Sequence, residues 1–235
     1  MHMKLFKQLA QFILLSVTLA SAPAFAKSDQ QSDPWEGFNR AMFNFNDALD
    51  RAILKPVAQG YRYVMPDIAE RGVHNFFENL GDVVTMVNNL LQLKPVEAVQ
   101  DLSRVVINTT IGIGGLIDVA SAMDIPKHDE DFGQTLGAWG VDSGPYLVLP
   151  LLGPSSLRDG VGRIPDTMID PLNQVADDET RTALWVGKVI DKRADLLKRE
   201  SVITGDRYIF IRDAYLQKRE FDVNDGRIPF KSSDF

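Results

Sequence analysis

The segment from Asp33 to Leu49 most constrains the fold of this chain, because it joins a strong helix start to an unusual choice of side chains. Asp33 and Glu36 stand three residues apart, as in a capping box, and Pro34 falls at the first helical position. An apolar stripe at helical spacing follows, with uncharged amides between its members. The stripe is Trp35, Phe38, Met42, Phe45 and Leu49, and the amides are Asn39, Asn44 and Asn46.

A helix that is aromatic on one side and amide-rich on the other suits a boundary between lipid and water. Asparagine is a poor helix former, and an ordinary surface helix would carry glutamate and lysine at these positions. The alternative is a core helix whose asparagines form internal hydrogen bonds. This segment alone leaves both interpretations open.

The first 26 residues have the pattern of a secretory signal peptide. Lys4 and Lys7 supply the positive start, an apolar core follows, and Ala24–Ala26 forms a small-x-small cleavage site. The apolar core is shorter than the roughly 20 residues that span a bilayer. We therefore expect residues 1–26 to direct export and to be removed, and residues 27–32 to form a short flexible leader.

The charge balance limits the partners of this chain. The net charge is −7, and removal of Lys4 and Lys7 with the signal segment would take it to −9. An acidic chain lacks the basic footprint of a nucleic-acid binder and would not adsorb to anionic headgroups by charge. Contact with a membrane would therefore require burial of apolar surface.

Cysteine is absent from the sequence, so the fold contains no disulfide. The sequence as given therefore also lacks a lipid-modified N-terminal cysteine. The roughly 209 residues that follow the signal segment are enough for one sizeable core.

Helix signals follow one another along the chain, and no alternating stretch of useful length indicates a strand. We therefore expect an all-α protein. The first helix should end near Lys55, because the residue before a proline is pushed out of the helical region. Charged residues such as Asp191 and Arg193 are expected outside the apolar stripe of a later helix. The helices are expected at about 34–54, 67–80, 82–91, 95–111, 118–123, 178–197 and 206–221, followed by a polar tail over 222–235.

Residues 124–165 have a different composition, rich in glycine and proline, which predicts loops and turns. Within this region the run from Tyr146 to Leu152 is almost wholly apolar. Solvent-facing loops rarely have that composition. The run is therefore expected to be buried against the helices or to contact a membrane or a partner.

Signals of catalysis, metal binding or cofactor binding are scarce. The glycines of 112–115 follow a helical pattern, which favours close packing or a kink over a phosphate loop. The run His128–Asp131 lacks the spacing of a calcium loop and predicts a solvated acidic turn. His74 lies within a helical pattern and is expected to be an ordinary helix residue rather than a general base. We expect no enzyme, no cofactor and no metal.

Several blocks of sequence, in order, resemble the MlaA family, also called VacJ. The resemblance covers about residues 33–221, and ordered blocks with sensible loop lengths make it far more specific than one motif. The blocks are Asp33–Asn46, Met86–Gln92, Asn108–Ala120, Phe132–Gly137, Gly140–Pro150, Ser156–Asp159 and Arg212–Gln217.

The resemblance implies an outer-membrane protein of a phospholipid-transport system that maintains lipid asymmetry. The fold that the resemblance implies is a ring of amphipathic helices embedded in the membrane around an amphipathic channel. Misplaced phospholipid of the outer leaflet would enter the channel, and a periplasmic carrier of the MlaC type would take it inward without nucleotide. Trimeric porins would hold the ring in place.

On this basis two sets of residues are expected to act on lipid. Neutral polar groups suit the wall of a channel that a headgroup crosses, because unsatisfied polar groups are costly in an apolar layer. The expected wall residues are Asn39, Asn44, Phe45 and Asn46. The flexible segment from Gly137 to Gly153, whose glycines permit motion and whose apolar tip can reach lipid, is expected to form a hairpin that gates the channel. The residues singled out in it are Gly137, Gly140, Asp142, Gly144, Pro145 and Tyr146.

Two features depart from the family pattern. The lipid-modified cysteine is missing, so attachment through lipid cannot be carried over. Asp142 stands where another glycine is expected, and a carboxylate there would stiffen or charge the gate. A soluble periplasmic lipid-binding or scaffolding protein is the alternative function, favoured by the missing cysteine and the negative charge. A periplasmic hydrolase would need a nucleophile–base pair that the sequence does not offer.

Overall fold

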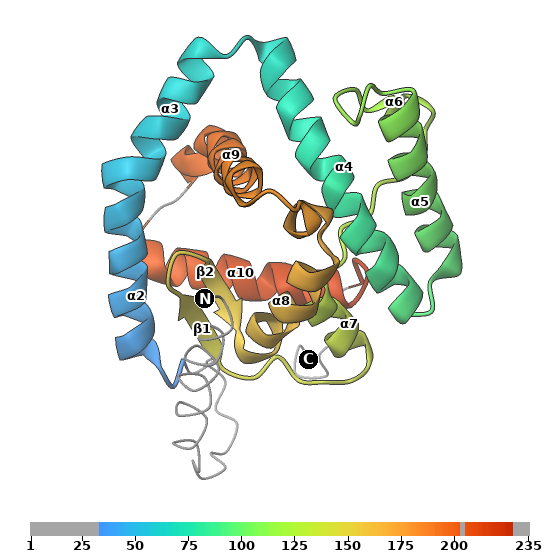
Figure 1. Cartoon of the computed structure of the whole chain (residues 1–235). Helices are drawn as coiled ribbons and strands as arrows, with labels where there is room; N and C mark the ends of the chain where they lie inside the picture. The colour runs from blue at the N-terminus through green and yellow to red at the C-terminus, as the bar shows by residue number, and fades with distance from the viewer. Residues whose placement is uncertain (1–32, 203–204, 228–235) are drawn as a thin grey trace. The chain divides into compact units, whose positions relative to one another are not determined.

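The computed structural model describes residues 33–202 and 205–227 (Figure 1). The expected signal peptide, the leader and most of the C-terminal tail lie outside these residues. The described part of the chain is mostly helical, as the sequence predicts, with one two-stranded sheet. Its α-helices are α2 (Glu36–Leu49), α3 (Lys55–Val64), α4 (Asp67–Leu91), α5 (Pro95–Thr110), α6 (Val119–Ala122), α7 (Phe132–Ala138), α8 (Leu157–Ile169), α9 (Asp178–Leu196) and α10 (Arg207–Val223).

Shorter elements complete the order. A π-helical turn, η1 (Asp50–Leu54), joins α2 to α3, and two 3₁₀ segments, η2 (Pro171–Gln174) and η3 (Leu197–Val202), flank α9. Strands β1 (Tyr146–Leu149) and β2 (Gly153–Ser156) form an antiparallel hairpin in which Tyr146 pairs with Ser156 and Leu149 with Gly153.

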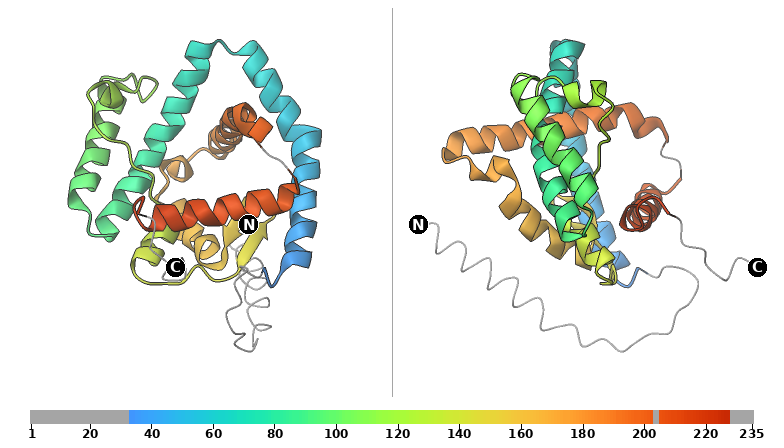
Figure 2. Two further views of the ribbon diagram at one scale, coloured as in Figure 1. Left: turned by 180° about the vertical axis from the view of Figure 1, so that it is seen from behind. Right: turned by 90° about the vertical axis from the view of Figure 1, so that its right-hand side faces the viewer.

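Within residues 33–227, α2, η1 and α3 form one continuous rod, and α4 returns on the opposite side (Figure 1). The hairpin, α7 and α8 lie between the lower ends of α2 and α4, and α5 packs along the outer side of α4. Helix α9 crosses between α3 and α4 and contacts both (Figures 1 and 2). Helix α10 packs on α7 and β2.

The expected end of the first helix near Lys55 is wrong, since the rod continues through Pro56 into α3. The backbone N–H of Lys55 donates to the carbonyl of Asp50, five residues back, instead of four. This wider π turn makes room for the proline ring, which would otherwise press on the carbonyl four residues before it.

The expected break at Asp82 is also wrong, because α4 runs unbroken from Asp67 to Leu91. The Asp82 carboxylate is buried and accepts a hydrogen bond from Arg104 Nε at 3.3 Å. It is therefore the partner of a buried cation and does not cap a helix.

The loop expected over 124–165 contains α7, the hairpin and α8. Gly162 lies inside α8, where a Cβ atom would stand 2.6 Å from the backbone nitrogen of Gly133 at the start of α7. Glycine here permits two helices to cross closely, rather than a turn. The expectation of no strand is likewise corrected by the short β1–β2 pair.

The later helices agree better with the sequence. Helix α9 begins after Asp177, whose side chain accepts from Thr180 N–H, and α10 begins after Asp206, which accepts from Tyr208 N–H. Asp191 and Arg193 were expected on the outer face of α9, but both are buried in ion pairs.

The apolar core is small. It is centred on Tyr146, Val148 and Tyr208, with four partly buried side chains packed against them: Met42, Phe43, Tyr215 and Leu216. The hairpin therefore lies at the centre of the apolar packing, between α2 and α10.

Candidate functional site

Helix α2 buries its polar face and exposes its apolar face, the reverse of an ordinary core helix. Its aromatic stripe faces outward, with Phe38 and Phe45 each 51% exposed. Asn39 is completely buried, Asn46 is half-buried and Asn44 is exposed. The amide face therefore packs against the protein, and the aromatic face is left open.

Asn39 is bonded through its whole side-chain amide. Its Oδ1 accepts from the N–H of Val148 at 2.9 Å, and its Nδ2 donates to the carbonyl of Tyr146 at 3.0 Å. Nδ2 also donates to Asp33 Oδ1 at 2.8 Å. Asn39 therefore belongs to the scaffold that holds β1, and its amide is fully occupied there.

Asn46 repeats the pattern two turns further along α2. Its Nδ2 donates to the carbonyl of Leu149 at 2.9 Å, and its Oδ1 accepts from the N–H of Leu151 at 2.8 Å. We call the pair Asn39 and Asn46 the asparagine clamp. Internal hydrogen bonding, the second interpretation of the sequence, is what these two side chains display.

The side chain of Tyr146, in β1, packs on aromatic residues of α10. The ring of Tyr146 lies 6.2 Å from that of Tyr208 and 6.0 Å from that of Tyr215, between centroids. Burial raises the pKa of Tyr146 to about 12, so the phenol stays neutral. Strand β1 is thus held through its backbone by amides of α2 and through the Tyr146 ring by tyrosines of α10.

The residues expected to gate a channel do not form one hairpin. Gly137 lies in α7, where a Cβ would stand 2.7 Å from a methyl carbon of Val223. Gly140 and Gly144 lie in the segment between α7 and β1 and have φ angles of +87° and +67°. Asp142 is exposed in the same segment.

The hairpin itself turns through Pro150, Leu151 and Leu152, which we call the tip. Leu151 is 65% exposed and Leu152 51% exposed. Leu151 has a φ of +64°, a left-handed conformation that costs a leucine free energy. The exposed apolar end of the hairpin is therefore the tip rather than the glycine-rich segment before it.

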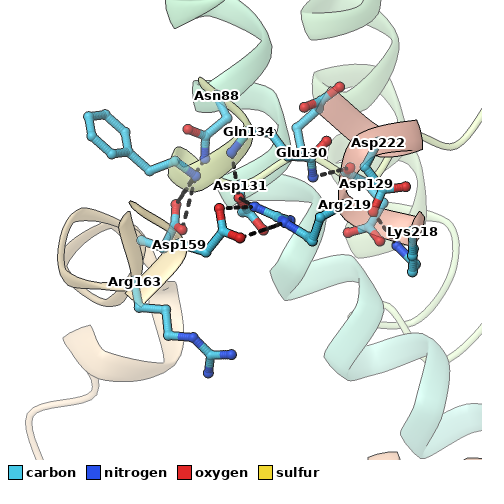
Figure 3. A network of polar contacts seen from close by, with 12 residues as sticks. Asn88, Asp129, Glu130, Asp131, Gln134, Asp159, Arg163, Lys218, Arg219 and Asp222 are labelled. Atoms are coloured by element: carbon cyan, nitrogen blue, oxygen red, sulfur yellow. Dashed lines mark hydrogen bonds and ion pairs between the residues drawn. The ribbon is translucent and has the colours of Figure 1, made fainter. Parts of the chain in front are cut away.

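Arg219 of α10 lies between two carboxylates (Figure 3). Its guanidinium contacts Asp131, at the start of α7, at 2.7 and 2.9 Å, and Asp159 of α8 at 2.8 and 3.1 Å. Burial alone would raise the pKa of Asp159, but hydrogen bonds from Arg219 and Tyr215 hold it at about 2. This network joins three helices through charge.

A second buried cation joins α4, α5 and α6. Arg104 is 1% exposed and contacts Asp82 at 3.3 Å and Asp118 at 3.1 Å. Asn108, on the same face of α5, donates to Asp118 at 3.0 Å. The inner face of α5 is therefore polar and closely bonded.

The outer face of α5 is apolar. The side chains at Val99, Leu102 and Val106 are 60%, 47% and 51% exposed. The described surface carries further large exposed apolar side chains beside this face and on α8 and α9. They include Leu90, Leu93, Val96, Ile111, Ile113, Leu116, Ile117, Val161, Ile164, Met168, Trp185 and Val186.

The sequence predicted a solvated acidic turn at His128–Asp131, but side chains within it make specific contacts with other parts of the chain. His128 Nδ1 lies 2.8 Å from Asp101 Oδ1, and Glu130 pairs with Lys94 at 3.1 Å. Among the described residues no group of three or more histidine, aspartate or glutamate side chains is arranged to hold a metal ion. The glycines of 112–115 form a turn after α5, and the close packing that the sequence favoured is present, since a Cβ at Gly112 would lie 2.1 Å from the carbonyl oxygen of Ile117.

Sequence reasoning missed the cations Arg104 and Arg219, which organise the polar interior. For Arg104 a signal was present, because Asp101, Arg104 and Asn108 recur at spacings of three and four opposite the apolar stripe of α5. For Arg219 no local pattern exists, since its partners lie 60 and 88 residues away in the chain.

None of the helices in the described part of the chain has both the length and the apolar character needed to cross a bilayer. Together the fold and these contacts define a mostly helical protein in which α2 and α5 bury polar side chains and expose apolar ones. The chain belongs to the MlaA lipoprotein family, whose model matches residues 31–222.

Named relatives agree with this assignment. The chain is 39% identical to the "Intermembrane phospholipid transport system lipoprotein MlaA" of Escherichia coli K12, over 92% of this chain and 89% of that protein. The protein of the same name from Haemophilus influenzae is 34% identical over 85% of this chain and 82% of its own length.

A solved structure is also similar. It comes from work on the "structural basis for maintenance of bacterial outer membrane lipid asymmetry" and matches with a TM-score of 0.73 and 39% identity. The match covers 82% of this chain and all of that one.

Proposed function

We propose that this chain is the outer-membrane component of an intermembrane phospholipid transport system. In this role it provides an amphipathic channel that removes misplaced phospholipid from the outer leaflet and hands it to a periplasmic carrier. The observation that carries the proposal is the inverted distribution of side chains on α2 and α5, whose aromatic and aliphatic residues face outward while asparagine, aspartate and arginine are buried.

Energetics favour a lipid environment for such a surface. Apolar area in water costs about 25 cal/mol per Å², and a soluble monomer rarely exposes large continuous apolar patches. On α5 the apolar residues Val99, Leu102 and Val106 face out while Asp101 and Arg104 are buried. In lipid that orientation is favourable, because the buried polar groups pair with one another.

The helices need not cross the bilayer to be embedded. A ring of amphipathic helices can lie in one leaflet with apolar sides toward acyl chains. The exposed Asn44 and Phe45 of α2 are proposed to contact the lipid path, with Asn39 and Asn46 supporting them through β1. The segment from Gly137 to Tyr146 and the apolar tip are proposed to gate the path.

Partners follow from the same proposal. The lipid cargo is phospholipid, a trimeric porin is proposed to hold the ring in the outer membrane, and a periplasmic carrier of the MlaC type is proposed to receive the lipid. Such a channel is passive, so the direction of net transport is set elsewhere in the pathway.

Membrane fractionation of the native protein tests this function, followed by mass spectrometry of what co-purifies in mild detergent. Recovery in the outer membrane with phospholipid and a porin trimer is the expected result. Recovery as a lipid-poor periplasmic monomer would overturn it and favour the soluble lipid-binding or scaffolding protein.

A further inference from the structure

Helix α2 acts as the neighbour of strand β1 through the asparagine clamp. Asn39 bonds backbone groups of residues 146 and 148, and Asn46 bonds those of residues 149 and 151. Each side-chain amide supplies one donor and one acceptor, as a residue of an adjacent strand does. The clamp thus bonds backbone N–H and carbonyl groups of β1 and of the tip.

The distance between the two asparagines along α2 is close to the distance between their backbone targets along the hairpin. Asn39 and Asn46 are seven residues apart, which is about 10.5 Å along a helix and returns to the same face. Their backbone targets are displaced by three residues, which is about 10 Å along an extended chain. Backbone groups three residues apart in a regular strand point to opposite edges, so Asn46 reaches its targets where β1 ends and the chain turns.

The two ends of the clamp differ in how firmly they are held. Asn39 is completely buried, is oriented by Asp33, and bonds the part of β1 that packs on Tyr208. Asn46 is half-buried, and its target Leu151 is 65% exposed. Water can therefore compete for the bonds of Asn46 far more readily than for those of Asn39.

The backbone at the tip favours release. Leu151 follows Pro150 and has a φ of +64°. Proline followed by a positive φ is the pattern of a type II turn, in which glycine is the preferred residue at the second position. Leucine there is strained, and the bond from its N–H to Asn46 Oδ1 helps to hold it.

From this arrangement we infer that Asn39 is the hinge of the hairpin and Asn46 its latch. Breaking the two bonds of Asn46 frees the apolar tip, Pro150–Leu152, while the bonds of Asn39 keep the base of β1 on α2. Both asparagines are positioning residues. The inference deepens the proposed function, on which it rests for the assumption that movement of the tip controls access of phospholipid.

Hydrogen–deuterium exchange of the full chain in mild detergent, read at single amides, tests the inference without any transport assay. Asn46→Ala is expected to speed exchange of the Leu151 amide about tenfold and to leave the Val148 amide protected. Asn39→Ala is expected to speed exchange at both amides. Asn44→Ala, an exposed asparagine of the same helix, is the matched control and should change neither.

Two results would overturn the hinge and latch. One is unchanged protection of Leu151 in Asn46→Ala, and the other is equal loosening of the whole hairpin by both clamp variants. Protection of amides in α4 serves as the check of folding. If Asn46→Ala does not fold, Asn46→Leu replaces it, since leucine has a similar shape but can neither accept from Leu151 N–H nor donate to the carbonyl of Leu149. Increased exchange confined to the tip is then expected, and none there would contradict the latch.

A lipid-transfer measurement on the same variants separates the two proposals. If the exchange pattern is as expected but transfer of phospholipid is the same in Asn46→Ala as in the original chain, the hinge and latch stand and the gating role fails. If the exchange pattern is absent, the hinge and latch fail whatever the transfer rates are.

Discussion

Arg219 donates two hydrogen bonds to Asp131, from Nη1 at 2.7 Å and from Nη2 at 2.9 Å, and so attaches the last helix to the start of α7. The Arg219 side chain is 11% exposed, and its guanidinium also contacts Asp159. Its planar fork suits two carboxylates, which a lysine cannot engage in the same way. Helix α10 therefore depends on a charge pairing as well as on aromatic packing.

Replacing Arg219 by alanine is expected to destabilise the protein by about 3 kcal/mol, because the buried Asp159 carboxylate would lose its main partner. Chemical unfolding in mild detergent measures the change. Lys218→Ala is the matched control, since Lys218 is 66% exposed and pairs only at the surface with Asp222. That variant should cost less than about 1 kcal/mol. Equal effects at 218 and 219 would contradict this role of the network.

The pKa of Asp159 predicts a loss of stability in acid. Its folded-state pKa is about 2, below the ordinary value of 3.8. A lowered pKa stabilises the fold above the unfolded value, and that stabilisation disappears as the pH falls through the folded value. The group should therefore contribute about 2 kcal/mol at pH 5 and lose it between pH 4 and pH 2. Unfolding free energies across this range measure it.

The variant to compare with the original chain across this pH range is Asp159→Asn. The variant should be less stable than the original chain at pH 5, because Arg219 would lose a charged partner. Its free energy of unfolding should fall less steeply between pH 4 and pH 2. Parallel pH profiles for the two chains would show that Asp159 does not carry this dependence.

Two glycines of α8 are expected to respond oppositely to alanine. A Cβ at Gly162 would lie 2.6 Å from Gly133 N and 2.9 Å from Gly133 Cα, so backbone must shift. Gly162→Ala should destabilise by about 1–3 kcal/mol through overpacking. A Cβ at Gly160 meets nothing closer than 3.6 Å, so Gly160→Ala should stabilise by about 0.5–1 kcal/mol. Thermal unfolding of both variants checks the pair, and the same sign for both would contradict the helix crossing.

A charge on the outer face of α5 should distinguish lipid from water around it. Leu102 is 47% exposed, so Leu102→Glu should leave the helix content in detergent unchanged but reduce recovery in the membrane fraction several-fold. Gln217→Glu, at an exposed polar position of α10, is the control and should fractionate as the original chain does. Unchanged membrane recovery for Leu102→Glu would argue that this face does not contact lipid.

Much of the helical structure is predictable from local sequence. The starts of α9 and α10 follow from Asp177 and Asp206, whose side chains accept from free N–H groups of the first turn. Proline and glycine were less reliable guides. Pro56 did not end the first helix because a π turn accommodates its ring, and Gly162 marks a helix crossing rather than a loop.

The family and its blocks were also predictable, whereas the arrangement of the expected site residues was not. Asn39 bonds residues more than 100 positions away, so no pattern around it indicates that it is buried beside β1. Arg219 depends in the same way on carboxylates of α7 and α8. Contacts between residues so far apart in the sequence depend on how the helices pack, and the local spacing of residues does not predict them.

The sequence by itself determined most of the helices outside residues 124–165 and which side of each is apolar, because both follow from spacing along one segment. Only the tertiary structure decided which side faces inward. In α2 and α5 the amides, carboxylates and guanidinium groups find partners on other elements and are buried, so the apolar sides remain outside. The physical reason is that a polar group is buried at low cost only when distant parts of the chain supply its hydrogen bonds.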